Sequence, residues 1–543
     1  MKIQSVTTAL LFLLIASSFS FAQTPPRPKL VVGVVVDQMR WDFLYRYSEK
    51  YSANGFKRLL REGYNCENTY INYSPSYTAA GHTCIYTGSV PTIHGIAGNN
   101  WFDYKENKVV YCTEDTTRKT IGSGSKAGMM SPARMLTTTI TDELKLATNF
   151  QSKTIGISLK DRGAILPAGH AANAAYFYDG STGGWITTSF YMNDLPAWVK
   201  GVNEQKLPEK YLSQNWNTLL PIAQYFESTE DDKHFESAFQ NETKPVFEHK
   251  VSELKSPTPD VIRATPYGNT FTLDFAKAAI SNEKMGQGKF TDFLAVSLSS
   301  PDYIGHQFGP NSVEVEDCYL RLDKDFADFF SYLDQTIGKG NYLLFLTADH
   351  GAAHVPDFLK ENKMPAGVFP MDSVLKLLNV KLKATYGEGK WLLGYENMQV
   401  YLNNKLLAEK EIDRDGFKAT IRSFIYQFNG VAKVFDMEDL GEELLEADMR
   451  AAINNGYYPG RSGDVYILLE PAWFEGMEKG TTHGTIYPYD THIPLVWMGW
   501  NIKPGENYSE IHMTDIAPTI AAMLHIQEPN GCVGKVIEGI FDK

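Results

Sequence analysis

Carboxylate and imidazole side chains recur along this chain at spacings that suit the binding of a metal ion. Asp302 and His306 are four residues apart, so they share one face if their segment is helical. Asp349 and His350 are adjacent and precede Gly351. Neighbouring residues on a strand point to opposite faces, so this pair could bind one ion only in a turn beyond a strand end. Taken alone, each pattern also fits an ordinary turn or a solvated helix face.

Two more residues, Asp37 and His483, bring the candidate ligands to six, which is enough for two sets of three. Asp37 follows an apolar run and could also be a helix N-cap, and His483 lies in a polar turn where a lone histidine is usually solvated. The nearby His492 is interpreted as structural or as a neighbour of a ligand. Catalytic zinc prefers three N/O ligands and an open position, and two such ions about 4 Å apart stabilise both oxygens of an in-line displacement. Magnesium would want more oxygen and less imidazole. The sequence therefore predicts two Zn²⁺ ions, one bound by Asp302, His306 and His483 and the other by Asp37, Asp349 and His350.

A hydroxyl group at Thr78 stands before three small residues, Ala79, Ala80 and Gly81, where a helix is predicted to begin. A helix N-terminus offers free N–H groups and partial positive charge to a phosphate, and small residues let a substrate approach the backbone. A threonine hydroxyl is a poor nucleophile unless something such as a metal ion activates it. Without the metal set Thr78 would be a plain helix cap; with it, Thr78 is the predicted nucleophile.

Four short apolar runs must position these groups, and polar residues follow each: 30–36, 154–159, 293–298 and 342–346. Near-continuous apolar runs are typical of strands buried on both faces of a parallel sheet, and ligands bind beyond the carboxyl ends of such strands. Helical stretches such as 131–148 and 313–337 lie between them, and a capped helix is expected at 516–524. The predicted fold is α/β, with a central, mostly parallel sheet covered by helices on both faces. Residues 166–267 and 354–478 fit the alternation poorly and are expected to be inserted cap segments.

The first 22 residues are typical of a cleavable signal peptide, with Lys2, an apolar run at 9–15 and the small residues Ser20 and Ala22. The apolar run is shorter than the roughly 20 residues that span a bilayer. We therefore expect residues 23–543 to be exported, to a bacterial periplasm or the medium, without a membrane anchor.

The amino-acid composition limits the kinds of partner that the protein can bind. The 543 residues carry a net charge of −13 with dispersed basic residues, which argues against nucleic acid as a specific partner. An acidic protein that handles an anionic substrate needs local positive charge, which bound metal supplies. The five cysteines could form at most two pairs, and none is spaced for a thiolate zinc site.

Together these residues resemble the alkaline phosphatase superfamily, most closely its phosphate-irrepressible monoesterase branch. The resemblance spans nearly the whole chain after the signal peptide and rests on these segments: Val36-Asp37-Gln38-Met39-Arg40, Ser76-Tyr77-Thr78-Ala79-Ala80-Gly81-His82, Gly98-Asn99-Asn100-Trp101, Lys160-Asp161-Arg162-Gly163, Ser300-Pro301-Asp302-Tyr303-Ile304-Gly305-His306, Thr347-Ala348-Asp349-His350-Gly351 and Thr482-His483-Gly484.

The resemblance implies an alkaline-phosphatase-like catalytic domain over 23–543 and the two zinc sets above, with the Thr78 oxygen as a further ligand of the second zinc. It also implies that Asn99, Lys160 and Arg162 bind the phosphate. On spacing alone Asn100 could replace Asn99, and Lys160 and Arg162 could be a solvated pair.

The function this predicts is hydrolysis of a broad range of small phosphate monoesters through a phospho-threonine intermediate, by a monomer. The alternative within the same superfamily is a nucleotide pyrophosphatase or phosphodiesterase. A sulfatase is disfavoured because the sequence has no Cys-x-Pro-x-Arg segment. A non-catalytic binding protein is disfavoured because the ligand set and the nucleophile are complete.

Overall fold

The computed structural model describes residues 26–254, 259–476 and 478–540, so the predicted signal peptide lies outside the described residues. The centre of its main sheet is parallel. β1 (Leu30–Val36) pairs with β10 (Tyr342–Thr347) on one side and with β9 (Asp292–Leu298) on the other. β9 pairs in turn with β6 (Thr154–Ser158), and β6 with β7 (Ala174–Asp179). The predicted apolar runs are four of these buried strands, and their parallel arrangement is confirmed.

Both flanks of this 11-stranded sheet contain antiparallel pairs. β18 (Leu495–Gly499) runs antiparallel to β10. β2 (Tyr64–Tyr70) pairs antiparallel with β18 and β17 (His492–Ile493), and parallel with β19 (Gly505–His512). On the other flank β8 (Gly184–Thr188) runs antiparallel to β7 and β5 (Thr120–Ile121). Because β7 and β8 belong to the main sheet, the first part of the expected insertion at 166–267 is sheet, and the segment outside the sheet begins after β8.

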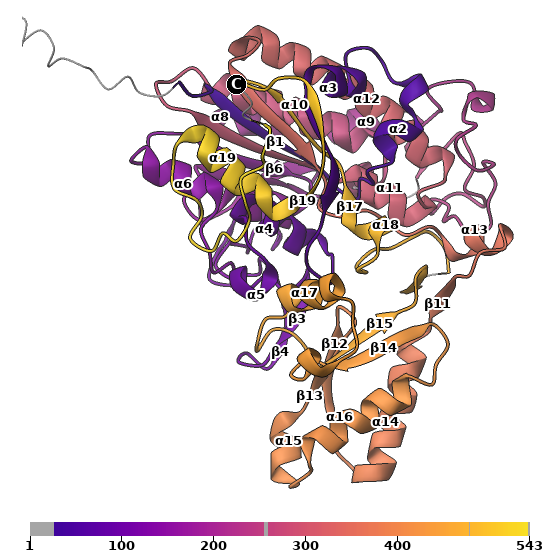
Figure 1. The fold of residues 1–543 in the computed structure, drawn as a ribbon. Coiled ribbons are helices and arrows are strands. Elements are labelled where there is room, and N and C mark those ends of the chain that lie inside the picture. Colours follow the sequence, from indigo (N-terminus) through magenta and orange to yellow (C-terminus); the bar gives the residue numbers. More distant parts are fainter. Residues whose placement is uncertain (1–25, 255–258, 477, 541–543) are drawn as a thin grey trace, which may run out of the picture.

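Helices cover both faces of the sheet (Figure 1). One group contains α4 (Thr78–Thr87), α6 (Ile140–Ala147), α7 (Asp161–Ala168) and α19 (Ile516–Leu524). The other contains α3 (Phe56–Glu62), α10 (Tyr267–Glu283), α11 (Ser300–Phe308) and α12 (Val313–Leu333). The helix predicted over 131–148 is shorter than expected. It begins at Ile140, because Thr139 and Asp142 form a capping box there.

A second lobe extends from the main body and carries α14, α15 and α16 (Figure 1). Its four-stranded sheet has the order β12 (Leu392–Glu396), β13 (Gln399–Leu402), β15 (Val465–Leu469) and β14 (Val431–Asp436). Its helices are α14 (Met371–Tyr386), α15 (Asn404–Glu409), α16 (Arg414–Ile425) and α17 (Ala447–Gly456), and it has a hydrophobic core of its own. β11 (Gly367–Phe369) and β16 (Trp473–Glu475) pair where the chain enters and leaves the lobe. The lobe falls within the segment 354–478 that did not fit the strand–helix alternation.

No helix in the described part of the chain is long and apolar enough to cross a membrane. All five cysteines lie in this part and carry free thiols.

Candidate metal-dependent active site

The parallel strands bring the predicted ligands to one edge of the sheet, because their carboxyl ends meet there. Asp37 directly follows β1, and Lys160 lies two residues beyond β6. Asp302 lies in the first turn of α11, just after β9, and Asp349 and His350 follow β10. Segments that are distant in sequence therefore converge at one place. His483 arrives from the loop that leads from the second lobe to β17.

The first ligand group forms around Asp302. Its Oδ1 lies 3.1 Å from His306 Nε2 and 3.8 Å from His483 Nε2. The ligand atoms of these three residues lie within 4.8 Å of one another, so they can contact one ion. The four-residue spacing of Asp302 and His306 places both on one face of α11, as the sequence predicts.

The second group forms around His350. Its Nε2 lies 3.5 Å from Asp37 Oδ1, 3.4 Å from Asp349 Oδ2 and 3.3 Å from Thr78 Oγ1. Ligand atoms of Asp37, Asp302 and His350 also lie within 4.8 Å of one another. Asp302 therefore borders both groups, which the sequence did not predict. Thr78 is the first residue of α4, so the hydroxyl group lies at a helix N-terminus beside this cluster.

The donor set of this cluster fits a bound cation. Asp37 Oδ1 is buried and accepts no hydrogen bond from the described residues, and the buried Asp349 Oδ2 has only the long 3.3 Å contact to His82 Nδ1. A buried carboxylate oxygen without a partner is costly. Both oxygens face His350 Nε2 at the distances given above. A divalent cation between these three atoms would supply the missing interaction.

Each histidine is oriented by a contact behind its ring. Nδ1 of His306 donates to Thr481 O at 2.8 Å, Nδ1 of His350 to Gly351 O at 3.0 Å and Nδ1 of His483 to Ser76 O at 2.9 Å. This tautomer leaves Nε2 unprotonated toward the carboxylates, as a metal ligand requires. Burial, and then the neighbouring His350 and His306, hold the pKa of His483 well below its usual value.

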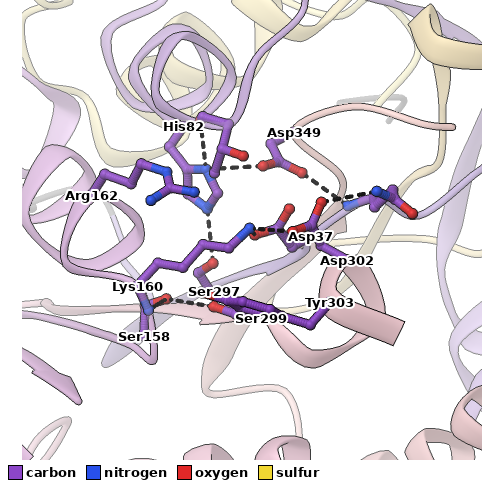
Figure 2. A network of polar contacts seen from close by, with 12 residues as sticks. Asp37, His82, Ser158, Lys160, Arg162, Ser297, Ser299, Asp302, Tyr303 and Asp349 are labelled. Carbon is purple, nitrogen blue, oxygen red and sulfur yellow. Dashed lines mark hydrogen bonds and ion pairs between the residues drawn. The ribbon is translucent and has the colours of Figure 1, made fainter. Parts of the chain in front are cut away.

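The carboxylates repel one another in this buried place. Burial, and then the negative charges of Asp302 and Asp349, raise the pKa of Asp37 well above its usual value. Lys160 offsets part of this charge, because its Nζ lies 2.6 Å from Asp37 Oδ2 and 2.6 Å from Asp302 Oδ2 (Figure 2). The ammonium group predicted to bind phosphate therefore bridges the two carboxylates in this structure.

Of the other predicted phosphate-binding residues, Asn99 lies beside the start of α4, and Arg162 lies on α7, which packs against α4. Asn99 Oδ1 accepts a hydrogen bond of 3.0 Å from Ala79 N, and no described residue accepts a hydrogen bond from its amide N–H groups at the start of α4. Asn100 is exposed on β3 (Asn100–Asp103), so the geometry favours Asn99. Arg162, in the first turn of α7, donates to Tyr111 Oη at 3.1 Å, and its buried Nε has no partner in the described part of the chain.

Two residues of the site were not predicted from the sequence. His82 Nδ1 lies 2.9 Å from Thr78 O and 3.3 Å from Asp349 Oδ2, and His82 Nε2 lies 2.8 Å from Ser297 Oγ (Figure 2). Gln38 donates from its backbone N to Asp349 Oδ1 at 3.2 Å and from Nε2 to Asp302 Oδ1 at 2.9 Å. Its φ of 64° is unusual for a residue other than glycine. The available signals were the four-residue spacing of Thr78 and His82, the position of Gln38 next to Asp37, and the presence of both residues in segments that carry the family resemblance.

His492 has a structural role, which is one of the two roles considered from the sequence. Its ring stacks between Trp41 and Tyr70, with ring centroids 4.6 Å from each, and its Nε2 contacts Glu67 O at 2.8 Å. It touches none of the ligands.

A hydroxyl group at a helix N-terminus, beside two groups of carboxylates and imidazoles at the end of a parallel sheet, is the arrangement of the alkaline phosphatase superfamily. Within it, the chain belongs to the type I phosphodiesterase / nucleotide pyrophosphatase family, whose profile matches residues 31–500.

Three relatives cover almost the whole chain. A protein of Myroides odoratus named calcium-transporting ATPase is 52% identical over 97% of each chain. Alkaline phosphatase PhoV of Synechococcus elongatus is 52% identical over 96% of this chain and 94% of its own. Alkaline phosphatase PafA of Elizabethkingia meningoseptica is 48% identical over 95% of each. The crystal structure of wild-type PafA matches with a TM-score of 0.94 at 47% identity, over 96% of this chain and 100% of that one. The expected fold class is thereby confirmed.

Proposed function

We propose that this chain is an alkaline phosphatase that hydrolyses a broad range of small phosphate monoesters through a phospho-threonine at Thr78. The observation that carries this proposal is the position of Thr78 Oγ1, 3.3 Å from His350 Nε2 and beside the buried carboxylates of Asp37 and Asp349. Asp302, His306 and His483 would hold one zinc ion, and Asp37, Asp349, His350 and the Thr78 oxygen would hold the second. The names of the relatives PhoV and PafA support the monoesterase activity.

The residues of the chain have separate tasks in this reaction. When bound, the two cations activate the hydroxyl and the attacking water and stabilise the leaving oxygen. Thr78 Oγ1 forms a bond to phosphorus as the ester P–O bond breaks, and the departing alkoxide takes up a proton. Water then attacks the phospho-threonine, which releases phosphate and restores the hydroxyl group.

Asn99 and Arg162 would donate to the phosphoryl oxygens, where their stabilisation grows as charge moves in the transition state. Lys160 would join them once cations, rather than its ammonium group, neutralise Asp37 and Asp302.

A phosphodiesterase or nucleotide pyrophosphatase is the second candidate, because the family description includes both. A diester carries an organic group where a monoester carries a charged oxygen. The buried ammonium group of Lys160 and the half-buried guanidinium of Arg162 favour the dianionic monoester. The test compares kcat/KM for an aryl phosphate and a bis-aryl phosphate on zinc-loaded enzyme, and a preference for the diester would reverse our order. ATP belongs in the same panel because of the name of the Myroides relative.

The covalent step has its own test. The zinc-loaded enzyme is mixed with a ³²P-labelled monoester and quenched in acid, and the protein-bound label is counted. We expect label in wild type and Thr78→Ser, and none in Thr78→Ala. Thr83→Ala is the matched control, because it removes a hydroxyl group from the same helix, where Thr83 Oγ1 donates to Ala79 O. Label that persists in Thr78→Ala would refute the assignment, and a chelator should abolish turnover until zinc is returned.

We also propose export and a monomeric state. Cleavage of residues 1–22 would leave Gln23 as the N-terminus of the protein recovered from a periplasmic fraction. Sedimentation of the purified enzyme tests the monomer, and a dimer mass would contradict it.

A further inference from the structure

A cavity of about 510 Å³ opens beside the ligand cluster, toward the second lobe. His483 belongs to both places, because its Nε2 faces Asp302 while the residue also lines the cavity. Tyr77, which directly precedes Thr78, continues the wall and packs edge-on against His483 with ring centroids 5.6 Å apart. The volume is typical of a small-molecule site, for which the range is about 300–1,000 Å³. A group in this cavity therefore lies next to His483 and to Tyr77, the residue that precedes Thr78.

The opposite wall comes from the second lobe and is aromatic and thioether in character. Phe369 and Met371 contribute from the start of the lobe, Tyr395 from the end of β12, and Met398 from the turn between β12 and β13. Aromatic faces and methionine sulfur accommodate apolar groups and also attract cations. This wall suits an aryl or alkyl group better than a hydrated anion.

Two carboxylates give the cavity a negative field. Glu475, at the end of β16, and the exposed Asp372 line it, and none of the described lining residues is Lys or Arg. The Tyr395 hydroxyl donates to the Glu475 carboxylate, which fixes its position. Burial, and then the charges of Glu396 and Asp372, raise the pKa of Glu475, so these carboxylates act on one another. The N-terminus of α14 also faces the cavity, and Asp372 in its first turn offsets the partial positive charge of the helix.

We propose that this cavity receives the alcohol part of the substrate and favours aryl and alkylammonium alcohols over anionic ones. The inference rests on the proposed function, since the alcohol is the group that leaves beside His483. A positive charge on the alcohol would lie near Glu475 and against the rings of Tyr77 and Tyr395. A negative charge at the same place would be repelled by Glu475 and Asp372. Glu475 and Tyr395 are thus specificity-determining residues.

The test uses two matched pairs of compounds. Benzylphosphonates with a meta trimethylammonium or a meta carboxylate group measure binding by calorimetry, because their C–P bond is not hydrolysed. The corresponding phenyl phosphates measure kcat/KM. We expect the cationic compound of each pair to be favoured. Glu475→Gln should lower the cation-to-anion ratio about 5- to 10-fold, as expected for one charge lost from a partly screened site. Asp372→Asn, at the rim, should lower it less.

Asp415→Asn is the matched control, because it removes one negative charge from a side chain that is 82% exposed on α16. It should leave the ratio unchanged, and inhibition by inorganic phosphate should be the same in all variants. Equal binding of the two phosphonates by wild type, or a Glu475→Gln ratio within twofold of wild type, would overturn the inference. Selective phosphonate binding without turnover of either ester would support the cavity's role and refute the proposed function. Turnover of both esters without selective phosphonate binding would support the proposed function and refute the role of the cavity.

Discussion

Each ligand of the cluster is held by a second residue behind it, and His82 shows what this does at the scale of one side chain. The ring joins three parts of the site, since it contacts the backbone of the nucleophile, the carboxylate of Asp349 and the hydroxyl group of Ser297. Residues that orient metal ligands contribute to metal affinity almost as ligands do. We therefore treat His82 as a positioning residue.

Replacement of His82 by Ala should weaken zinc binding about 10- to 100-fold, because Asp349 loses a neighbour that fixes its orientation. Competition with a chromogenic chelator measures this affinity without reference to activity. His512→Ala, on a partly exposed histidine that contacts Glu510, is the control and should bind zinc as wild type does. An unchanged zinc affinity in His82→Ala would show that the ring contributes packing alone and does not orient Asp349.

Most of the ligands could be predicted from the sequence because they follow an apolar run or recur at a local spacing, whereas His483, in a polar turn, could be assigned only as a member of the whole ligand set. The positioning residues could not be predicted, because their partners are distant in the chain. Gln38 contacts residues 264 and 311 positions away, and His82 contacts one 215 positions away. Only the folded sheet edge brings such pairs together. The bridging position of Lys160 between Asp37 and Asp302 was unpredictable for the same reason.

At the scale of elements, α4 must approach the Asp349 loop very closely to present Thr78 there. A Cβ atom built on Gly81 would lie 2.5 Å from Asp349 O and 2.8 Å from its Cβ. These are mostly backbone atoms that cannot turn away. The absence of a side chain at residue 81 thus sets the distance between the nucleophile and the second ligand group.

Gly81→Ala should therefore lower the free energy of unfolding by about 1–3 kcal/mol, the usual cost of overpacking, and should also reduce kcat. Denaturant titration of the zinc-loaded protein measures the first effect. Gly201→Ala is the matched control, since a Cβ atom there meets nothing within 4 Å on α8 (Ala197–Glu204). It should be neutral or stabilise by up to about 1 kcal/mol, as alanine does inside a helix. Equal stability of the two variants would contradict the close approach.

The contact between α10 and α12 should respond to pH through Asp325. Burial raises the pKa of this carboxyl group to about 7, while Thr270 donates to its Oδ2 at 3.0 Å. The folded protein thus holds the proton more tightly than the unfolded chain, and this group costs stability as pH rises from about 4 to about 7. Asp325→Asn should be more stable than wild type by about 1 kcal/mol at pH 8 and equal to it at pH 4, because solvent partly screens the charge of this half-buried residue.

Thermal unfolding of both proteins across this pH range measures the difference. Asp415→Asn, whose side chain is 82% exposed on α16, serves as the control and should show no such gain. A gain that stays constant with pH would mean that the charge of Asp325 is not its cause.

Among the elements, the continuous apolar strands at the centre of the sheet were predictable, and the polar strands β2 and β19 at its flank were not. The residues of β1 and β10 form continuous apolar runs. β2 and β19 are mostly polar and carry no such pattern, although they pair over much of their length. They form strands because they pair with each other and because β2 also pairs with β18 of the main sheet.

At the scale of the whole molecule, Arg461 ties the second lobe to the main body. Its Nη1 donates to the carbonyl groups of Gly95 and Arg134, and its guanidinium lies 5.2 Å from the ring of Trp101. A lysine ammonium group has neither the planar shape of the guanidinium nor its ability to stack on an aromatic ring. The cavity beside His483 lies between the same two parts of the molecule, so this contact also bears on its shape.

Arg461→Lys should lower the Tm of the metal-loaded protein by about 2–4 °C, because one hydrogen-bonded, stacked contact is lost in a large domain. Calorimetry measures the shift. Arg118→Lys, whose side chain is 39% exposed beside Asp115, should change the Tm by much less. Identical shifts for the two variants would show that Arg461 has no special role between the lobes.

The proposed ligands are spread from Asp37 to His483 of a chain of 543 residues. During synthesis, the imidazole of His483 leaves the ribosome only after most of the polypeptide has already emerged. The group around Asp302 cannot close before that moment, although Asp37, Asp349 and His350 emerge much earlier. Strands β17, β18 and β19 also follow residue 483, so a product terminated before it would lack one flank of the sheet as well as a proposed ligand, and we expect it to be inactive.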